Sequence, residues 1–350
     1  MKILITHEIF PPDMSGGGEM LTAKIASTLI EKGHDVKILT SGNPRVKSYK
    51  NIPTTRIKTN RYLMNLQIKK ILDESADVDL IHTSSGNMCF PSWVASELNN
   101  KPICCYVHHI HGPYWKDIRG HIVGSVFELL EKLFLTRDYD AIIFQNKTSM
   151  RMGSRMGIKK GRMHMIQPGI DYRKFQMNVK KKPFVLFVGN LDMNKSMCKT
   201  KGLEYLIEAA GYLPEVKFIV VGDGDYLSNM KKKSPSNVFF TGPLFGKQLI
   251  KLYNEAMLFC LPSLTEGFGL TILEAMASGC AVISTVDIGQ TGILIKPKSV
   301  GQIKSAIEAL LGNQSKTIKM GQKNRRLVKK FTWKRFFDDL IKIYGSITRK

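Results

Sequence analysis

The stretch Leu258–Thr285, LFCLPSLTEGFGLTILEAMASGCAVIST, contains a complete strand–helix–strand unit. An apolar run, LFCLPS, precedes a glycine turn and an apolar helix pattern that begins near Leu270 and ends at Gly279. A second apolar run, AVIST, follows. Gly279 stands where a glycine commonly ends a helix in the left-handed conformation. Strands joined by a helix in this way are typical of a parallel sheet with right-handed crossovers.

The same alternation continues along the whole chain of 350 residues. Helical patterns such as Met20–Lys32, Pro91–Leu98 and Ile122–Leu135 separate short β-rich runs. The runs that predict strands are KILIT, DVKILT, DLIHTSS, PICCYVHH, AIIFQN and MHMIQPG in the first half, and FVLFVGN, VKFIVVGDG, NVFFTG, LFCLPS, AVIST and GILIKP in the second. A chain of this length favours two domains over one oversized core.

We therefore predict an α/β fold with two doubly wound Rossmann-like domains that face an interdomain cleft. The lysine-rich segment NVKKKP at Asn178–Pro183 is predicted to be the linker between the two halves. The expected division is residues 1–177 for the first domain and 178–331 for the second. Residues 332–350 are expected to form a C-terminal helix that packs back on the first domain.

The composition combines an ordinary hydrophobic fraction with a strong excess of basic residues. Against 29 Asp and Glu the chain has 52 Lys and Arg, a net charge of +23. Such a charge attracts polyanions, anionic lipid surfaces or phosphorylated small molecules, although a generally basic surface without a partner is an equal alternative. The cysteines lack CxxC spacing, which favours buried thiols in a reducing compartment over disulfides or a zinc site. No signal peptide or membrane-spanning run is evident, so we expect a cytoplasmic protein.

The candidate binding and catalytic residues come directly after predicted strands. Open parallel sheets bind their ligands at this position, beyond the carboxyl ends of the strands. After KILIT comes the glycine-rich loop that ends in SGGGE, and after CCYV come His108, His109 and His111. After FVLFVGN comes the loop that leads to Lys201. No GxGxxG follows a strand, and neither a P-loop nor a GxSxG elbow is present. The pattern therefore argues against nicotinamide, flavin, P-loop and α/β-hydrolase chemistry.

Two glutamates lie in the stretch quoted first, on either side of a glycine turn. Gly267 and Gly269 let the backbone approach a ligand closely. The helix start that follows offers unpaired N–H groups to a diphosphate. Glu274, within that helix, can accept hydrogen bonds from vicinal hydroxyls such as those of a ribose, and Glu266 points to another part of the same ligand. The layout predicts a nucleotide-sugar site.

The chain resembles the family-4 retaining glycosyltransferases, which have the GT-B fold. The resemblance covers nearly the whole chain, and EGFGLTILEAMASGCAVIST is similar to the E-x7-E segment of the family. Further similar segments are FPPDMSGGGE, IEKGHDVKILT, IQPGIDYRKF, FVGN followed by KGLEYLIEAA, and VVGDGDYL. The family transfers a sugar from a nucleotide diphosphate donor with retention of configuration, without a metal or another cofactor.

The resemblance also implies roles for individual residues. Glu274 would bind the donor ribose, Glu266 the sugar hydroxyls near the reaction centre, and Lys201 the diphosphate. His108 matches the family's active-site histidine. His109 and His111, which allow another register, are expected to be packing or capping residues. The remaining donor-binding positions implied by the resemblance are Gly16, Gly17, Gly189, Asn190, Gly222, Phe268, Gly269, Leu270 and Thr271.

Two departures from the family pattern leave a second hypothesis open. Asn190 stands where family members usually carry an arginine. Only Val286–Gln290 remain where the family has a longer loop with a Gly-Gly-x-Pro-Glu pattern. Lys195 or Lys199 could replace the missing cation. The alternative to an active enzyme is a catalytically degenerate GT-B module that binds nucleotide sugar or glycan without turnover.

The implied partners are a nucleotide-sugar donor and a glycan or lipid-linked acceptor. Residues Arg45–Lys70 and Ile122–Arg137 combine basic and apolar side chains, which suggests peripheral contact with an anionic membrane at its inner face. The basic stretch KNRRLVKKFTWKRF prompts a nucleic-acid-binding hypothesis. We do not favour it, because no zinc, RNP-like or helix-turn-helix signature accompanies the stretch.

Overall fold

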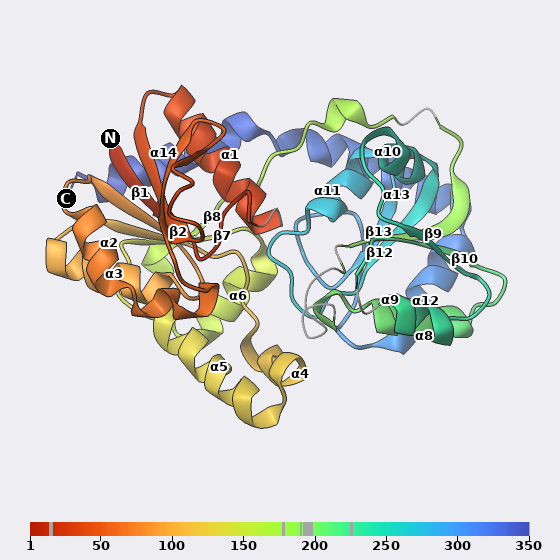
Figure 1. Ribbon diagram of the computed structural model, residues 1–350. Helices are drawn as coiled ribbons and strands as arrows, with labels where there is room; N and C mark the ends of the chain where they lie inside the picture. The colour runs from red at the N-terminus through yellow and green to blue at the C-terminus, as the bar shows by residue number, and fades with distance from the viewer. Residues whose placement is uncertain (14–16, 177–178, 190, 192–198, 225–226, 350) are drawn as a thin grey trace.

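The computed structural model describes residues 1–13, 17–176, 179–189, 191, 199–224 and 227–349. They form two sheets, each with helices around it, that lie beside one another as separate domains (Figure 1). The expected pair of doubly wound domains is therefore present.

The first domain is built on a sheet of eight strands in the order β3-β4-β2-β1-β5-β6-β7-β8. Neighbouring strands are parallel, except for β3 and β4. The strands are β1 (Lys2–Thr6), β2 (Asp35–Ser41), β3 (Ser48–Tyr49), β4 (Ile52–Ile57), β5 (Leu80–Ser84), β6 (Ile103–Tyr106), β7 (Ala141–Phe144) and β8 (Met163–Met165). The sequence interpretation missed β3 and β4. The segment IPTTRI of β4 carries a proline and an arginine, which obscure the apolar run of a strand.

Helical crossovers connect these parallel strands. The α-helices are α1 (Gly17–Glu31), α2 (Ile68–Ser75), α3 (Cys89–Asn99), α4 (Trp115–Arg119), α5 (His121–Leu135) and α6 (Lys147–Met156). Short 3-10 helices add η1 (Arg61–Leu66), η2 (Gly112–Tyr114), η3 (Lys160–Arg162) and η4 (Tyr172–Lys174). The helices predicted around Met20–Lys32, Pro91–Leu98 and Ile122–Leu135 are all present within a few residues of these bounds.

The second domain has a fully parallel sheet of six strands in the order β11-β10-β9-β12-β13-β14. The strands are β9 (Lys182–Val188), β10 (Lys217–Val221), β11 (Val238–Gly242), β12 (Ala256–Leu261), β13 (Ala281–Ser284) and β14 (Gly292–Leu294). In this order the chain reverses direction across the sheet between β9 and β12. Parallel sheets bind ligands at such a switch point, beyond the carboxyl ends of the strands.

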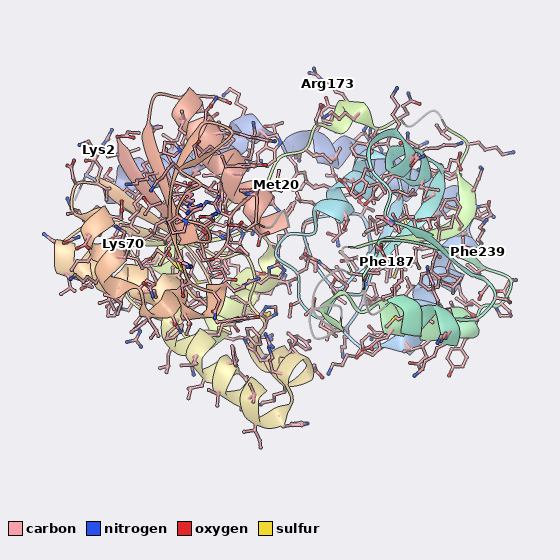
Figure 2. All side chains as sticks on the ribbon, in the orientation of Figure 1. Lys2, Met20, Lys70, Arg173, Phe187 and Phe239 are labelled. Carbon is pink, nitrogen blue, oxygen red and sulfur yellow. The ribbon has the colours of Figure 1, made fainter. Side chains whose placement is uncertain are left out.

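Helices cover both faces of the second sheet (Figure 1). They are α8 (Leu203–Gly211), α9 (Leu227–Lys233), α10 (Gly246–Glu255), α11 (Leu270–Ala277), α12 (Val300–Leu311) and α13 (Gln314–Leu327), with the 3-10 turns η5 (Lys199–Lys201) and η6 (Val328–Lys330). The strand residues between them form the core. Phe187 on β9 lies inside the domain, whereas Phe239 on β11 lies at its outer side and is 48% exposed (Figure 2).

The last helix, α14 (Trp333–Ile347), returns to the first domain (Figure 1). Its apolar residues recur every three to four positions, so that one stripe faces the core of the first sheet. In that core the hydroxyl of Tyr344 lies 2.5 Å from Nδ1 of His82 on β5. At the other crossing between the domains, Phe175 already packs in the core of the second domain. That residue stands two positions before the expected division.

The five cysteines among the described residues are all buried and free. This agrees with the expectation of buried thiols for Cys104, Cys105, Cys260 and Cys280. Cys198 lies outside the described residues. In the part of the chain that the structure describes, no helix is long and apolar enough to span a bilayer.

Candidate active site

The loops after β9 and β12 meet because these two strands are neighbours in the sheet. The backbone N–H of Leu264 donates to the carbonyl of Thr200 at 2.7 Å and ties the loops together. Gly202 has a φ of +66°, and a Cβ there would overlap the carbonyl of Pro262. Only glycine allows this close approach without strain. The Lys201 loop is thereby placed against the segment that carries Glu266.

Lys201 and Glu266 form an ion pair at this switch point. Nζ of Lys201 lies 2.7 Å from Oε2 of Glu266, and the two side chains are 22% and 9% exposed. The hydroxyl of Ser263 also donates to Oε2, at 3.3 Å. Burial by itself would raise the pKa of Glu266, but the charge of Lys201 and the nearby His109 outweigh it and lower that pKa. The carboxylate is therefore ionised at neutral pH.

His109 is the histidine that faces this pair. Its Nε2 lies 3.9 Å from Oε1 of Glu266, at the other carboxylate oxygen from the one that Lys201 holds. Burial lowers the pKa of His109, although the charge of Glu266 partly opposes this. We expected His109 to be a packing or capping residue. The structure instead puts it at the carboxylate, because the chain turns toward the second domain directly after β6.

His108, the expected active-site histidine, faces the first domain. Its ring lies 5.3 Å from the ring of His7 and 5.1 Å from that of Tyr106, measured between centroids. Its Nε2 is buried and has no hydrogen-bond partner among the described residues. Burial lowers the pKa of His108 well below the usual range, so the ring is neutral. Its Nδ1 is close to Gly18, which places it beside the start of α1 and the glycine-rich first loop.

His111 joins the two domains. Its Nδ1 lies 3.0 Å from the hydroxyl of Thr265, and burial lowers its pKa to about 3. Its ring also stands edge-on to Trp115, with centroids 4.4 Å apart. The expected packing role fits this position.

Glycines line the ends of β9 and β10 next to Lys201. Gly222 has a φ of +145°, and a Cβ there would overlap the carbonyl oxygen of Gly189. A Cβ at Gly189 would stand 3.9 Å from Cγ of Lys201. In the first domain, Gly17 begins α1 with open space around its Cβ position. The predicted positions Gly16 and Asn190, and Lys195 with them, lie outside the described residues.

Helix α11 starts beside the ion pair. Gly269 precedes it with a φ of +87°, a left-handed conformation that suits glycine. Phe268 is buried against Phe331, with ring centroids 6.2 Å apart, and this anchors the turn. Leu270, at the first helical position, is 37% exposed, and Thr271 is half-buried. The first-turn N–H groups, which a helix leaves unpaired, are therefore presented near Glu266.

Glu274 lies one turn further along α11 and belongs to a separate environment. Burial raises its pKa, and the neighbouring Tyr253 hydroxyl opposes part of that rise. No ion pair joins Glu274 to Lys201 or to another described basic residue. The two glutamates thus occupy different environments, Glu266 before the start of α11 and Glu274 within the helix. That they contact two parts of one ligand stays a prediction.

The short loop Val286–Gln290 contacts the first domain. Asp287 accepts from the N–H of Lys147 at 3.3 Å through its carbonyl, and its own N–H donates to the hydroxyl of Thr148 at 3.2 Å. Within the loop, Nε2 of Gln290 donates to the carbonyl of Val286 at 2.6 Å. The loop is therefore folded on itself and docked on the start of α6.

Sequence reasoning missed two side chains that hold this site in place. Asn146 caps α6 through Ser149 N–H at 2.7 Å, while its Nδ2 donates to the carbonyls of Glu266, at 3.3 Å, and of Gly267. Glu131 on α5 accepts the N–H groups of His111 at 3.0 Å and of Gly112 at 2.7 Å. Burial raises the pKa of Glu131 to about 7. The pattern QNKTS after a strand is a cap signal that could have indicated Asn146. No comparable signal marks Glu131.

Two family models match this chain. The model described as Glycosyltransferase Family 4 matches residues 15–174, and the one described as Glycosyl transferases group 1 matches residues 182–313. They meet near the linker, so that each describes one domain.

Curated relatives extend over most of the chain. The sulfoquinovosyl transferase of Arabidopsis thaliana is 24% identical over 350 residues, which cover 91% of this chain and 65% of that protein. The alpha-monoglucosyldiacylglycerol synthase of Streptococcus pneumoniae is 27% identical over 318 residues, which cover 81% of this chain and 71% of the relative.

Solved structures share the whole fold. Sucrose-phosphate synthase from Thermosynechococcus elongatus superposes with a TM-score of 0.76 at 20% identity, covering 99% of this chain and 98% of that one. Anabaena HepE in complex with UDP and glucose superposes with a TM-score of 0.69 at 20% identity, covering 100% and 98%. These matches confirm the predicted fold. The chain therefore belongs to the GT-B glycosyltransferases, with a family-4 first domain and a second domain of the group 1 type.

Proposed function

We propose that this glycosyltransferase moves a sugar from a nucleotide diphosphate donor to a glycan or lipid-linked acceptor, with retention of anomeric configuration and without a metal. The observation that carries the proposal is the partly buried Lys201–Glu266 pair at the sheet's switch point, next to the start of α11 and to His109. A cation, helix N–H groups and an ionised carboxylate in one place suit a ligand with a diphosphate at one end and hydroxyls at the other.

The diphosphate would lie between Lys201 and the first turn of α11. Leu270 and Thr271 contribute backbone N–H groups there. The lack of a side chain at Gly222 lets the carbonyl of Gly189 approach it, so that the ends of β9 and β10 lie close together beside Lys201. Negative charge grows on the diphosphate as the bond to the anomeric carbon breaks. Fixed donors and a cation that already face this position stabilise that charge without reorganisation.

The sugar would lie against Glu266 and the histidines after β6. The ionised carboxylate accepts hydrogen bonds from sugar hydroxyls, and Lys201 then shares its charge between Glu266 and the donor phosphate. In the transfer, the acceptor hydroxyl forms a bond to the anomeric carbon while the bond from that carbon to the phosphate oxygen breaks. The hydroxyl proton passes to the departing phosphate oxygen, so the step needs no protein nucleophile.

The nucleoside end of the donor would extend toward Glu274. A carboxylate on α11 can accept both vicinal hydroxyls of a ribose, and hydrogen bonds to a charged group are stronger than neutral ones. Burial raises the pKa of Glu274, so its ionised form gains from ribose hydroxyls that replace lost water.

The names of two relatives support a lipid-linked acceptor. We propose that the enzyme is cytoplasmic and meets this acceptor at the inner face of a membrane. One relative is the alpha-monoglucosyldiacylglycerol synthase already described. Another, from Escherichia coli, is a UDP-Gal:alpha-D-GlcNAc-diphosphoundecaprenol alpha-1,3-galactosyltransferase, 25% identical over 71% of this chain.

A second candidate function is nucleotide-sugar binding without turnover. It draws on the loop Val286–Gln290, which is short and hydrogen-bonded to α6 of the first domain. A loop held there brings few backbone N–H groups to the donor. Grafting a Gly-Gly-x-Pro-Glu segment between Thr285 and Thr291 should raise turnover, but leave nucleoside diphosphate affinity unchanged, if this loop limits transfer.

The direct test is transfer from a panel of UDP-, GDP- and ADP-sugars to glycan and lipid acceptors, with and without a chelator. We expect one donor to react, equal rates with chelator, and a product whose anomeric proton shows the donor configuration by NMR. An inverted product or a rate abolished by the chelator would contradict the proposed mechanism. Tight nucleotide binding without any product would favour the second candidate.

A further inference from the structure

Helix α5 exposes an apolar stripe to solvent. Its 15 residues run from His121 to Leu135, and at 100° per residue the exposed apolar positions fall on one side. These are Ile122 at 85%, Val123 at 48%, Val126 at 52%, Leu129 at 57%, Leu130 at 37% and Leu133 at 42% exposed. The opposite side is the buried one, with Gly124 and Leu135. The solvent-facing side of α5 is therefore a contiguous apolar patch, and such patches on a protein surface commonly mark an interaction site.

The 3-10 helix η1, which also exposes apolar side chains, lies near the α4–α5 corner. The hydroxyl of Tyr62 accepts a hydrogen bond from Arg119 at the end of α4, at 3.4 Å, so that η1 and the α4–α5 corner are adjacent. Tyr62, Leu63 and Leu66 are 48%, 47% and 70% exposed. Figure 1 shows α4 and α5, in yellow, at the edge of the first domain. We name the exposed apolar residues of α5 and η1 the α5 surface.

The acidic side chains of α4 and α5 are paired with lysines or turned inward. Asp117 pairs with Lys298 at 2.6 Å, and Glu128 with Lys116 at 3.1 Å. Glu131 faces the core and accepts the backbone N–H groups described above. Lys69 and Lys132, by contrast, are exposed. The border of the surface is thus basic, in a chain whose net charge is +23.

We propose that the α5 surface docks on an anionic lipid bilayer, lying in the interface with its apolar side chains among the acyl chains. An amphipathic helix with basic flanks has this preference. A second protein is the other candidate occupant, and the exposed lysines beside the surface, in a chain with a net charge of +23, favour the anionic bilayer over it.

The docked position would bring a lipid-linked acceptor to the active site. The inner face of α5 holds the histidine loop through Glu131, so the bilayer contact and His109 lie on two sides of one helix and its loop. An acceptor whose lipid stays in the bilayer then has its sugar or phosphate near the cleft. This choice of acceptor rests on the proposed function, while the docking itself does not.

The test is sedimentation with vesicles of phosphatidylcholine alone or mixed with phosphatidylglycerol, using the full chain. In one variant Val126, Leu129 and Leu133 are changed to serine, and in a charge variant Lys69→Glu is combined with Lys132→Glu. Matched controls change exposed residues of the second domain: Tyr212→Ser with Phe245→Ser, and Lys247→Glu with Lys251→Glu. Nucleoside diphosphate affinity and sedimentation in solution are measured for every variant.

We expect the parent to bind the mixed vesicles and not the neutral ones. Both α5-surface variants should bind at least roughly tenfold more weakly, with controls unchanged and nucleotide affinity kept throughout. Equal binding to both kinds of vesicle, or full binding by the serine variant, would overturn the proposal. The proposal would also be overturned if the parent were a dimer that binds no vesicles and if the serine variant were a monomer. In that case the α5 surface would bind a second copy of this chain. If the parent binds the mixed vesicles but binds no nucleoside diphosphate, the result contradicts the proposed function and not the docking.

Discussion

Replacing Lys201 by methionine tests whether the pair at the switch point is electrostatically coupled. The change keeps an aliphatic side chain but removes the cation 2.7 Å from Oε2 of Glu266, a side chain that is 9% exposed. The polar groups that remain beside the carboxylate include the Ser263 hydroxyl at 3.3 Å and the His109 ring at 3.9 Å. Without the cation, burial becomes the dominant influence and raises the pKa of Glu266 above its ordinary value.

The loss of stability has an upper bound. Breaking a buried pair by removing one partner costs about 3–5 kcal/mol, but a carboxyl group can escape by taking up a proton. At pH 7 that escape costs about 3.7 kcal/mol, because the ordinary pKa is about 4.3 and each unit is worth about 1.36 kcal/mol. Lys201 is also 22% exposed, so water screens part of the interaction. We expect the free energy of unfolding to fall by about 2–3 kcal/mol at pH 7.

The pH dependence should change sign with the substitution. In the parent the pKa of Glu266 is lowered, so its contribution to stability is complete above about pH 4.3 and is lost only as the pH falls through the lower folded pKa. In the variant the folded pKa is raised, and the folded state binds the proton more tightly than the unfolded state. The variant should therefore gain stability as the pH falls from 7 toward about 4.3.

The assay is urea unfolding of both proteins at about pH 7 and about pH 5.5. The matched control is Lys182→Met, which removes the cation of the Lys182–Glu255 pair at 2.8 Å, where the lysine is 60% exposed. Such an exposed pair should contribute about 0–1 kcal/mol. Adding Glu266→Gln to the Lys201 variant should recover much of the lost stability. A Lys201 variant as stable as the control, or one that loses further stability on acidification, would refute the electrostatic coupling.

The remaining predictions concern ligand binding and turnover. Glu274→Ala should weaken nucleoside diphosphate binding about tenfold or more, since charge-assisted hydrogen bonds contribute about 1.5–3 kcal/mol; it should not lower the unfolding midpoint, and unchanged affinity in calorimetry would disprove the ribose contact. His108→Ala should slow transfer more than it weakens nucleotide binding; if only His109→Ala slows transfer, the active-site histidine is the one beside the carboxylate. Asn146→Ala should reduce turnover about tenfold or more, because it loses two hydrogen bonds to the backbone before the α11 turn, each worth about 1 kcal/mol. Asn313→Ala, which removes a similar cap from α13, is the control and should destabilise without slowing transfer.

Local patterns in the sequence were enough to predict the two wound domains. Each strand of the second sheet corresponds to an apolar run, and the glycine turn before Leu270 marks the start of α11. These features depend on neighbours within a few residues, which the sequence displays directly. The prediction missed β4, because its alternating polar residues and proline do not form an apolar run.

The arrangement of the site was decided by tertiary structure. His108 and His109 are adjacent in sequence, yet one faces His7 and the other Glu266, because the path of the loop after β6 sets the direction of each ring. Asn146 reaches the carbonyl of Gly267 across the domain boundary. Contacts of this kind join residues more than a hundred positions apart, and no local pattern encodes them.

For α5, too, the sequence predicts the helix, but the tertiary structure decides which of its faces is exposed. The spacing from Ile122 to Leu133 identifies an apolar stripe on a helix, but an apolar stripe ordinarily faces a core. The packing instead turns Gly124 and Glu131 inward, where the glycine lets α4 approach and the carboxylate caps the histidine loop. The sequence by itself determined which elements form, because propensity and periodicity act over a few residues. The tertiary structure decided which faces meet, since only the packing of distant elements settles which side of a helix is buried.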